Sequence, residues 1–126
     1  MEILVAAFIE GREFRQSAPN STRIDIFGAH WSAPAADLPT QMQPHLFIVY
    51  RADMDDPATT PLTVAFFKGD EQVARQRMPL KLDRGMLGER LVQAQLEVKE
   101  YGEYRVEIEL PPAAKKTLYY KFVPAG

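Results

Sequence analysis

The chain has 126 residues, 46% of them hydrophobic and 25% charged, and its 15 basic and 17 acidic side chains give a net charge of −2. This length and composition indicate one globular domain with its own core, over residues 1–126, and exclude a disordered chain. The balanced charge gives no basic surface for nucleic acid, and the lack of cysteine excludes disulfides, thiol nucleophiles and thiolate metal sites.

The first apolar run, residues 3–9, is too short for a signal peptide, and the acidic Glu2 stands where such a peptide carries basic residues. No apolar run is long enough to span a bilayer. We therefore expect a cytoplasmic protein with no membrane or nucleic-acid partner.

Apolar residues recur mainly at a spacing of two, which is the period of a β-strand. In EYRVEIEL, for example, every second residue from Tyr104 to Leu110 is apolar and the residues between them are charged. The expected strands are residues 3–9, 23–27, 44–52, 62–68, 72–82, 91–98, 104–110 and 117–123. Proline- and glycine-containing turns separate them, and KGDEQ is typical of a tight hairpin with Gly69 at positive φ. This spacing predicts an all-β sandwich or barrel.

The segment MLGERLVQAQLEVKEYG fits two patterns. Leu87, Leu91, Ala94 and Val98 fall at helical spacing, but every second residue from position 92 to position 98 also fits a strand. We favour a strand from Leu91, because Tyr101 and Gly102 then form the turn into the next strand. A short helical turn over residues 86–90 remains an alternative.

The segment LEVKEYGEYRVEIEL resembles the late strands of immunoglobulin-like sandwiches, in which a glycine turn is followed by G-x-Y at the start of the next strand. Gly102 and Tyr104 match that pattern. The resemblance implies an immunoglobulin-like sandwich of seven or eight mostly antiparallel strands. It also implies that Tyr104 is buried, with its hydroxyl bonded to backbone within residues 98–102.

A wider resemblance rests on IDIFGA, a proline-containing loop, PHLFIVYRA and the YGEYRVEIEL ending. Together these segments are similar to a family of small uncharacterised bacterial proteins, which are stand-alone domains of about this length. The resemblance covers most of the chain and implies a bacterial origin and a β-sandwich. Its motifs are structural, so it assigns no catalytic residue.

The chain carries no motif of nucleophilic or nucleotide-dependent catalysis. G-x-S-x-G, G-x-G-x-x-G and the P-loop are all absent from the sequence. We therefore predict a protein that is not an enzyme and needs no cofactor.

The stretch RIDIFGAHW holds His30 and the single tryptophan, Trp31. One interpretation is a small-ligand pocket with the indole as a stacking surface and the imidazole as a polar group. The other, which we favour, is that Trp31 closes one end of the sandwich with its N–H bonded to a backbone carbonyl. His30 and His45 lack the local spacing of a zinc site, so we predict no metal there.

The loop RADMDDP offers Asp53, Asp55 and Asp56, and carboxylates on a sandwich loop are potential calcium ligands. The loop does not match the calcium-binding pattern of the EF-hand. We favour a solvated turn in which these side chains bond nearby backbone N–H groups, with calcium binding as the alternative.

Several strands are apolar on both faces. If Leu46 and Ile48 point inward, Phe47 and Val49 point outward, and the same argument places Phe67 and Tyr119 on outer faces. Two interpretations are equally open: these four side chains form an interaction surface, or the loop of residues 32–43 or the N-terminal strand covers them.

The sequence as a whole favours a non-enzymatic binding or assembly module that acts through an apolar strand face or a sheet edge, with a protein partner or a second copy. The alternative is a β-sandwich that binds a small ligand or calcium through the loops near Trp31 and residues 53–56.

Overall fold

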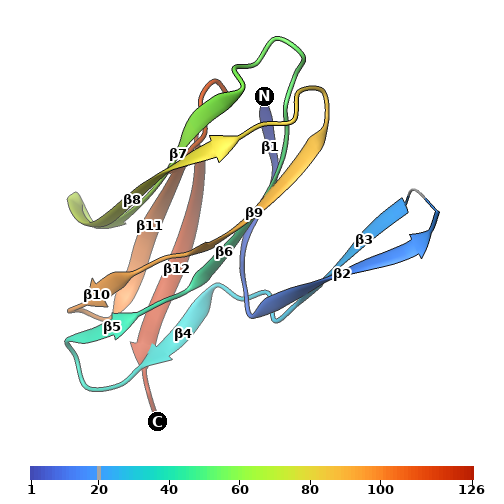
Figure 1. Cartoon of the computed structure of the whole chain (residues 1–126). Helices are drawn as coiled ribbons and strands as arrows, with labels where there is room; N and C mark the ends of the chain where they lie inside the picture. Colours follow the sequence, from blue (N-terminus) through green and yellow to red (C-terminus); the bar gives the residue numbers. More distant parts are fainter. Residues whose placement is uncertain (20) are drawn as a thin grey trace.

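The computed structural model describes residues 1–19 and 21–126, and these form an all-β sandwich (Figure 1). The twelve strands within the described residues are β1 (Glu2–Ile9), β2 (Gly11–Ala18), β3 (Ser21–Phe27), β4 (Ser32–Ala35), β5 (Thr40–Met42), β6 (His45–Arg51), β7 (Thr59–Lys68), β8 (Glu71–Lys81), β9 (Leu87–Gln93), β10 (Leu96–Val98), β11 (Gly102–Glu109) and β12 (Lys116–Pro124). None of the described residues forms a helix of the length and apolarity that crossing a bilayer requires.

The strands form two main sheets and two smaller ones. One main sheet has the order β1-β6-β9 and the other the order β4-β12-β11-β7-β8; β10 pairs with β5, and β2 pairs with β3. The pairing of β12 with β4 is parallel, and the other ladders between the described strands are antiparallel. The expectation of an all-β, mostly antiparallel sandwich is therefore confirmed.

The core lies between the two main sheets. Phe8 of the first sheet contacts Phe66 and Tyr120 of the second, with ring centroids 6.3 and 4.5 Å apart. The alternation in EYRVEIEL is confirmed as well, because Tyr104, Val106, Ile108 and Leu110 are all buried. The inner face of each strand thus supplies the apolar surface whose burial drives folding.

The corner before β11 has the geometry that the sequence predicted. The Tyr104 hydroxyl donates a hydrogen bond to the backbone carbonyl of Glu100 at 2.7 Å, and Tyr104 is buried. Gly102 has φ of 116°, a conformation that a residue with a Cβ adopts only under strain. The predicted tight turn at Gly69 is also confirmed, with φ of 61°.

Residues 87–98 are strand and not helix. Residues 87–93 pair along their whole length with β6, and residues 96–98 pair with β5, so the expected strand 91–98 is in fact two strands. The ladder with β6 supplies partners for the backbone groups of residues 87–93, and this tertiary pairing outweighs the helical propensity of the segment.

The chain has more strands than the seven or eight expected. Besides the division into β9 and β10, strands β2, β4 and β5 were not predicted. The alternation in β2, GREFRQSA, is hard to recognise because Phe14 is its one large apolar residue. Strands β4 and β5 have four and three residues, too few for any periodicity to be visible.

Candidate interaction surface

Strands β2 and β3 form a hairpin that projects from the sandwich (Figure 1). The two strands pair only with each other among the described residues. In their register Phe14 lies opposite Ile24, and Arg12 opposite Ile26. An isolated two-stranded hairpin is marginally stable in water, so this element depends on contacts at its base or on a further partner.

One face of the hairpin is apolar. Side chains directly opposite each other in an antiparallel pair share a face, so Phe14, Ile24 and Ile26 lie together with Arg12. Phe14 is 53% exposed and Ile26 is 45% exposed. The Arg12 guanidinium lies 5.1 Å from the centre of the Phe14 ring, a cation–π distance. We name Phe14, Ile24 and Ile26 the hairpin apolar face.

The opposite face of the hairpin is charged. It carries Glu13, Arg15, Arg23 and Asp25, which form two directly opposed pairs in the register. Asp25 accepts both arginines, with Arg15 Nε at 2.6 Å and Arg23 Nε at 3.1 Å from its two oxygens. The hairpin is therefore amphipathic and presents a different chemistry on each side.

A bidentate ion pair fixes the base of the hairpin to the sandwich. Arg12 Nε lies 2.8 Å from Glu89 Oε2, and its Nη2 donates to Oε1 at 3.3 Å. Glu89 is on β9, and β6 separates β9 from β1, which ends just before the hairpin. The Arg12 side chain therefore reaches a strand that is not adjacent to β1 in the sheet.

Two apolar side chains outside the core cluster are nevertheless buried. Phe47 is 0% exposed and Ile9 is also buried, yet neither belongs to the core cluster between the two sheets. The hairpin begins shortly after Ile9, at the end of β1. At its base Phe27 packs directly on Gly11, where a Cβ would stand 2.6 Å from the ring.

The predicted interaction surface of Phe47, Val49, Phe67 and Tyr119 is wrong as a single patch. Phe47 and Val49 lie on β6, whereas Phe67 and Tyr119 lie in the other main sheet. Phe47 lies outside the core cluster, as an outward residue of β6 should, but it is 0% exposed and so is not free for a partner. Val49 and Phe67 are partly buried, and the Arg105 guanidinium lies 4.6 Å from the Phe67 ring centre. Tyr119 alone is exposed, at 56%.

His30 and Trp31 separate in the structure. His30 lines a cavity of about 320 Å³ that also receives His45, Glu10 and Tyr120. Its Nδ1 lies 2.7 Å from the carbonyl oxygen of Gly28, and its ring meets Tyr120 edge-on at 5.6 Å. Burial raises the pKa of the Tyr120 hydroxyl to about 12, so this group stays protonated at neutral pH.

Trp31 does not close the end of the sandwich. Its side chain is 76% exposed, so the expectation of a buried indole is wrong. The Trp31 carbonyl accepts the backbone N–H of Lys121 at 3.0 Å, just before β4 pairs with β12. Backbone pairing therefore holds this position while the indole points to solvent.

The aspartates of the RADMDDP loop bind the amino terminus. The Met1 ammonium donates to Asp53 and lies 3.2 Å from Asp56 Oδ2. Asp56 is buried and accepts the backbone N–H of Asp53 at 2.6 Å, which is the favoured turn interpretation. Asp55 is exposed. Within residues 1–19 and 21–126, no three acidic or histidine side chains are grouped so that they could hold a metal ion.

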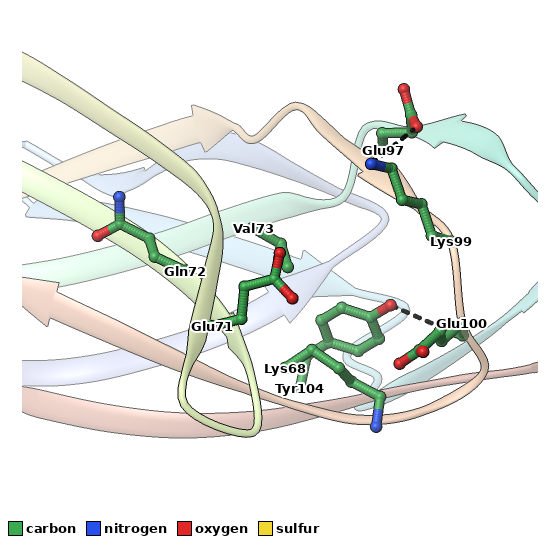
Figure 2. Close-up of a pocket in the computed structure, with 8 residues that line it drawn as sticks. All are labelled: Lys68, Glu71, Gln72, Val73, Glu97, Lys99, Glu100 and Tyr104. Atoms are coloured by element: carbon green, nitrogen blue, oxygen red, sulfur yellow. Dashed lines mark hydrogen bonds and ion pairs between the residues drawn. The ribbon is translucent and has the colours of Figure 1, made fainter.

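A further pocket of about 350 Å³ lies at the corner that Tyr104 forms (Figure 2). Its charged groups are of both signs and lie close to one another: Lys99 Nζ is 3.9 Å from Glu97 Oε1, and Lys68 Nζ is 5.8 Å from the Tyr104 ring centre. The Tyr104 hydroxyl points to Glu100 across the pocket (Figure 2). The pocket is thus lined by charged side chains of both signs, among which Lys99 and Glu97 form an ion pair.

Comparison with protein-family models and with curated proteins finds no match for this chain. The candidate surface therefore rests on the geometry alone. Its residues were not identified from the sequence as an interaction surface, although Arg23 to Ile26 alternate charged and apolar side chains in the way that an amphipathic strand requires.

Proposed function

We propose that the protein is a non-enzymatic binding or assembly module whose partner is a protein that covers the hairpin apolar face. The observation that carries this proposal is the exposure of Phe14 and Ile26 on an element that projects from the sandwich. Aromatic side chains are preferred anchors of protein interfaces, and burying Phe14 contributes roughly 1.5–3 kcal/mol to an association.

We also infer that the sandwich is immunoglobulin-like. The bond from the Tyr104 hydroxyl to the Glu100 carbonyl supports this inference, because a tyrosine at the same kind of corner bonds back to backbone in such folds. In this view the two main sheets form a rigid body, and the hairpin is an added element that carries the recognition surface.

Site-specific photocrosslinking tests the proposal. A photoreactive benzoylphenylalanine replaces Phe14 in one variant and Tyr119 in a matched control, since the two aromatic side chains are similarly exposed at 53% and 56%. Both variants are irradiated in cells that make the protein. We expect a protein adduct from position 14 and none from position 119. Absence of an adduct at position 14, or equal yields at both positions, would overturn the proposal.

The cavity beside His30 favours a second candidate function, the binding of a small organic ligand. Its volume of about 320 Å³ lies at the lower end of ligand pockets, and Tyr120 and the two histidines supply polar groups. Ligand-observed magnetic resonance with small aromatic carboxylates tests this candidate. We expect binding that His45→Ala weakens and that Trp31→Ala leaves unchanged; binding unaffected by His45→Ala would rule the cavity out.

A further inference from the structure

We infer that the partner at the hairpin is a second copy of this chain, joined edge to edge through β2 in antiparallel orientation with Phe14 on the two-fold axis. This inference rests on the proposed function and gives the partner a chemical identity.

The edge of β2 is the first reason. Strand β2 pairs with β3 on one side, and no other described strand pairs with it on the opposite side. Such an edge presents unpaired N–H and C=O groups, which are a template for another strand. A second hairpin would extend the two-stranded sheet to four strands, and sheets of three or more strands are stable where isolated hairpins are not.

The charged face supplies the second reason. In the hairpin register Glu13 lies opposite Asp25, and Arg15 opposite Arg23, so like charges face each other across both pairs. Asp25 forms ion pairs with both Arg15 and Arg23, which offsets the repulsion between the two arginines. Among the described residues, no basic group forms an ion pair with Glu13. The β2 side of this face therefore carries a carboxylate that a cation from outside would complement.

A second copy of β2 provides that cation. In an antiparallel pair centred on Phe14, position 13 of one strand lies opposite position 15 of the other. Glu13 then faces the partner's Arg15, and Arg15 faces the partner's Glu13, so the sequence Glu13-Phe14-Arg15 is complementary to itself. Phe14 meets the partner's Phe14 on the apolar face, where aromatic pairs are favourable.

The edge of β3 is a weaker alternative. A pair centred on Ile24 would place Arg23 opposite the partner's Asp25, so this edge is self-complementary in sign too. However, Asp25 already accepts Arg15 and Arg23 within its own chain. A third arginine, from the partner, would therefore stabilise Asp25 less than an arginine would stabilise the unpaired Glu13. The unmatched Glu13 therefore favours β2.

The β2 edge is fully used in this assembly. A two-fold axis through Phe14 uses the same patch on both copies, so pairing through β2 is complete in a dimer. The four-stranded sheet has the order β3-β2-β2-β3, and its apolar face combines both copies of the hairpin apolar face. The two sandwiches lie at opposite ends, because antiparallel hairpins extend in opposite directions.

Charge exchange between positions 13 and 15 tests the register. Four samples are compared by sedimentation velocity: wild type, Glu13→Arg, Arg15→Glu, and an equimolar mixture of the two variants. Either substitution alone places like charges opposite each other at both contacts of the dimer. In the mixture, each arginine of one variant meets a glutamate of the other, so complementarity returns in a heterodimer.

Within the hairpin, an arginine at position 13 faces Asp25, and a glutamate at position 15 faces Arg23, so each change replaces a directly opposed like pair by an opposite pair. Arg15→Glu also removes the ion pair between Arg15 and Asp25. Circular dichroism of each variant therefore checks that the fold is retained, and recovery in the mixture separates loss of the dimer from loss of the hairpin. Arg23→Glu is the control for the β3 edge.

We expect a wild-type dimer, a dissociation constant raised about tenfold or more in each variant, and recovery to within about threefold in the mixture. Arg23→Glu should stay within about threefold of wild type on the same basis. Three results would each overturn the inference. They are a monomeric wild type, a mixture of the two variants that does not associate, and a dissociation constant raised as much in Arg23→Glu as in Glu13→Arg and Arg15→Glu. A different protein crosslinked at position 14 would also overturn it while supporting the proposed function; no adduct at that position would remove both.

Discussion

At the scale of single residues, close contacts limit which side chains fit at certain positions of the sandwich. Gly88 is an example: a Cβ there would stand 2.5 Å from the Tyr50 ring, so the glycine lets β9 lie against that side chain. Tyr104 is another, because its hydroxyl binds the chain four residues earlier and fixes the turn into β11. At each of these positions, the identity of one residue fixes the position of a whole strand.

The Tyr104 hydroxyl gives the first prediction. Tyr104→Phe removes one hydrogen bond from a buried ring and should lower the free energy of unfolding by about 1 kcal/mol, as measured by urea denaturation. Tyr119→Phe, at an exposed ring, is the matched control and should change it by less than about 0.5 kcal/mol. Equal effects at the two positions would show that the corner bond contributes nothing.

Asp56 gives a pH-dependent prediction. The backbone N–H of Asp53 and then the Met1 ammonium hold the pKa of Asp56 below its usual value. Because the pKa is lowered in the folded state, the contribution of Asp56 is complete above its unfolded value, about 3.9, and is lost as the pH falls through the folded value. The thermal midpoint of Asp56→Asn should therefore vary less with acidification than that of wild type.

Asp55→Asn is the control for this experiment, since Asp55 is exposed in the same loop. Its midpoint should follow the wild-type curve between about pH 6 and pH 2, a range that contains the ordinary aspartate pKa. A wild-type acid profile in Asp56→Asn would contradict the assigned role of this carboxylate.

At the scale of elements, the hairpin β2–β3 has two parts with different roles. Its base is joined to β9 of the first main sheet by the Arg12–Glu89 pair. Its distal part leaves the sandwich and keeps Phe14 exposed. A single amphipathic element is thus attached to the sandwich at one end and presents an apolar surface at the other.

A comparison of two phenylalanines tests this division. Phe47→Ala should lower the free energy of unfolding by about 3–5 kcal/mol, the usual cost of a large cavity. Phe14→Ala removes the same atoms from an exposed position and should cost less than about 0.5 kcal/mol in the monomer. Guanidinium denaturation at low protein concentration measures both. A small loss for Phe47→Ala would contradict the burial of this side chain.

At the scale of the whole molecule, the sandwich and the distal hairpin are energetically separable. The core cluster is made by the two main sheets, β10 and their connecting segments, and no residue of β2 or β3 whose burial is described belongs to it. We therefore expect folding to depend on the sandwich and the proposed association to depend on the hairpin. An exposed apolar face of this kind is typical of an interaction site.

Shortening the hairpin tests this separation. Arg12 and Ile26 are directly opposite, so residues 13–25 can be replaced by the two-residue turn Asn-Gly, which closes an antiparallel pair. This variant keeps the Arg12–Glu89 pair. We expect its thermal midpoint, measured by calorimetry, to stay within a few degrees of wild type while self-association disappears. Unfolding of the shortened protein would show that the distal hairpin stabilises the sandwich.

The sequence by itself determined the all-β class, most of the longer strands, the inward residues of β11 and the corner at Tyr104. These features depend on the two-residue period and on glycine and tyrosine at fixed local positions, so short stretches contain them. The alternation in EYRVEIEL is sufficient to place Tyr104 and Val106 in the core, and both are buried.

Only the tertiary structure decided which outward apolar residue is covered. Phe47 and Phe14 are both phenylalanines on the outer side of strands, yet one is fully buried and the other half exposed. Strand periodicity tells which face a side chain takes but not what lies over that face. That depends on contacts between segments far apart in the chain, such as Arg12 with Glu89, 77 residues later.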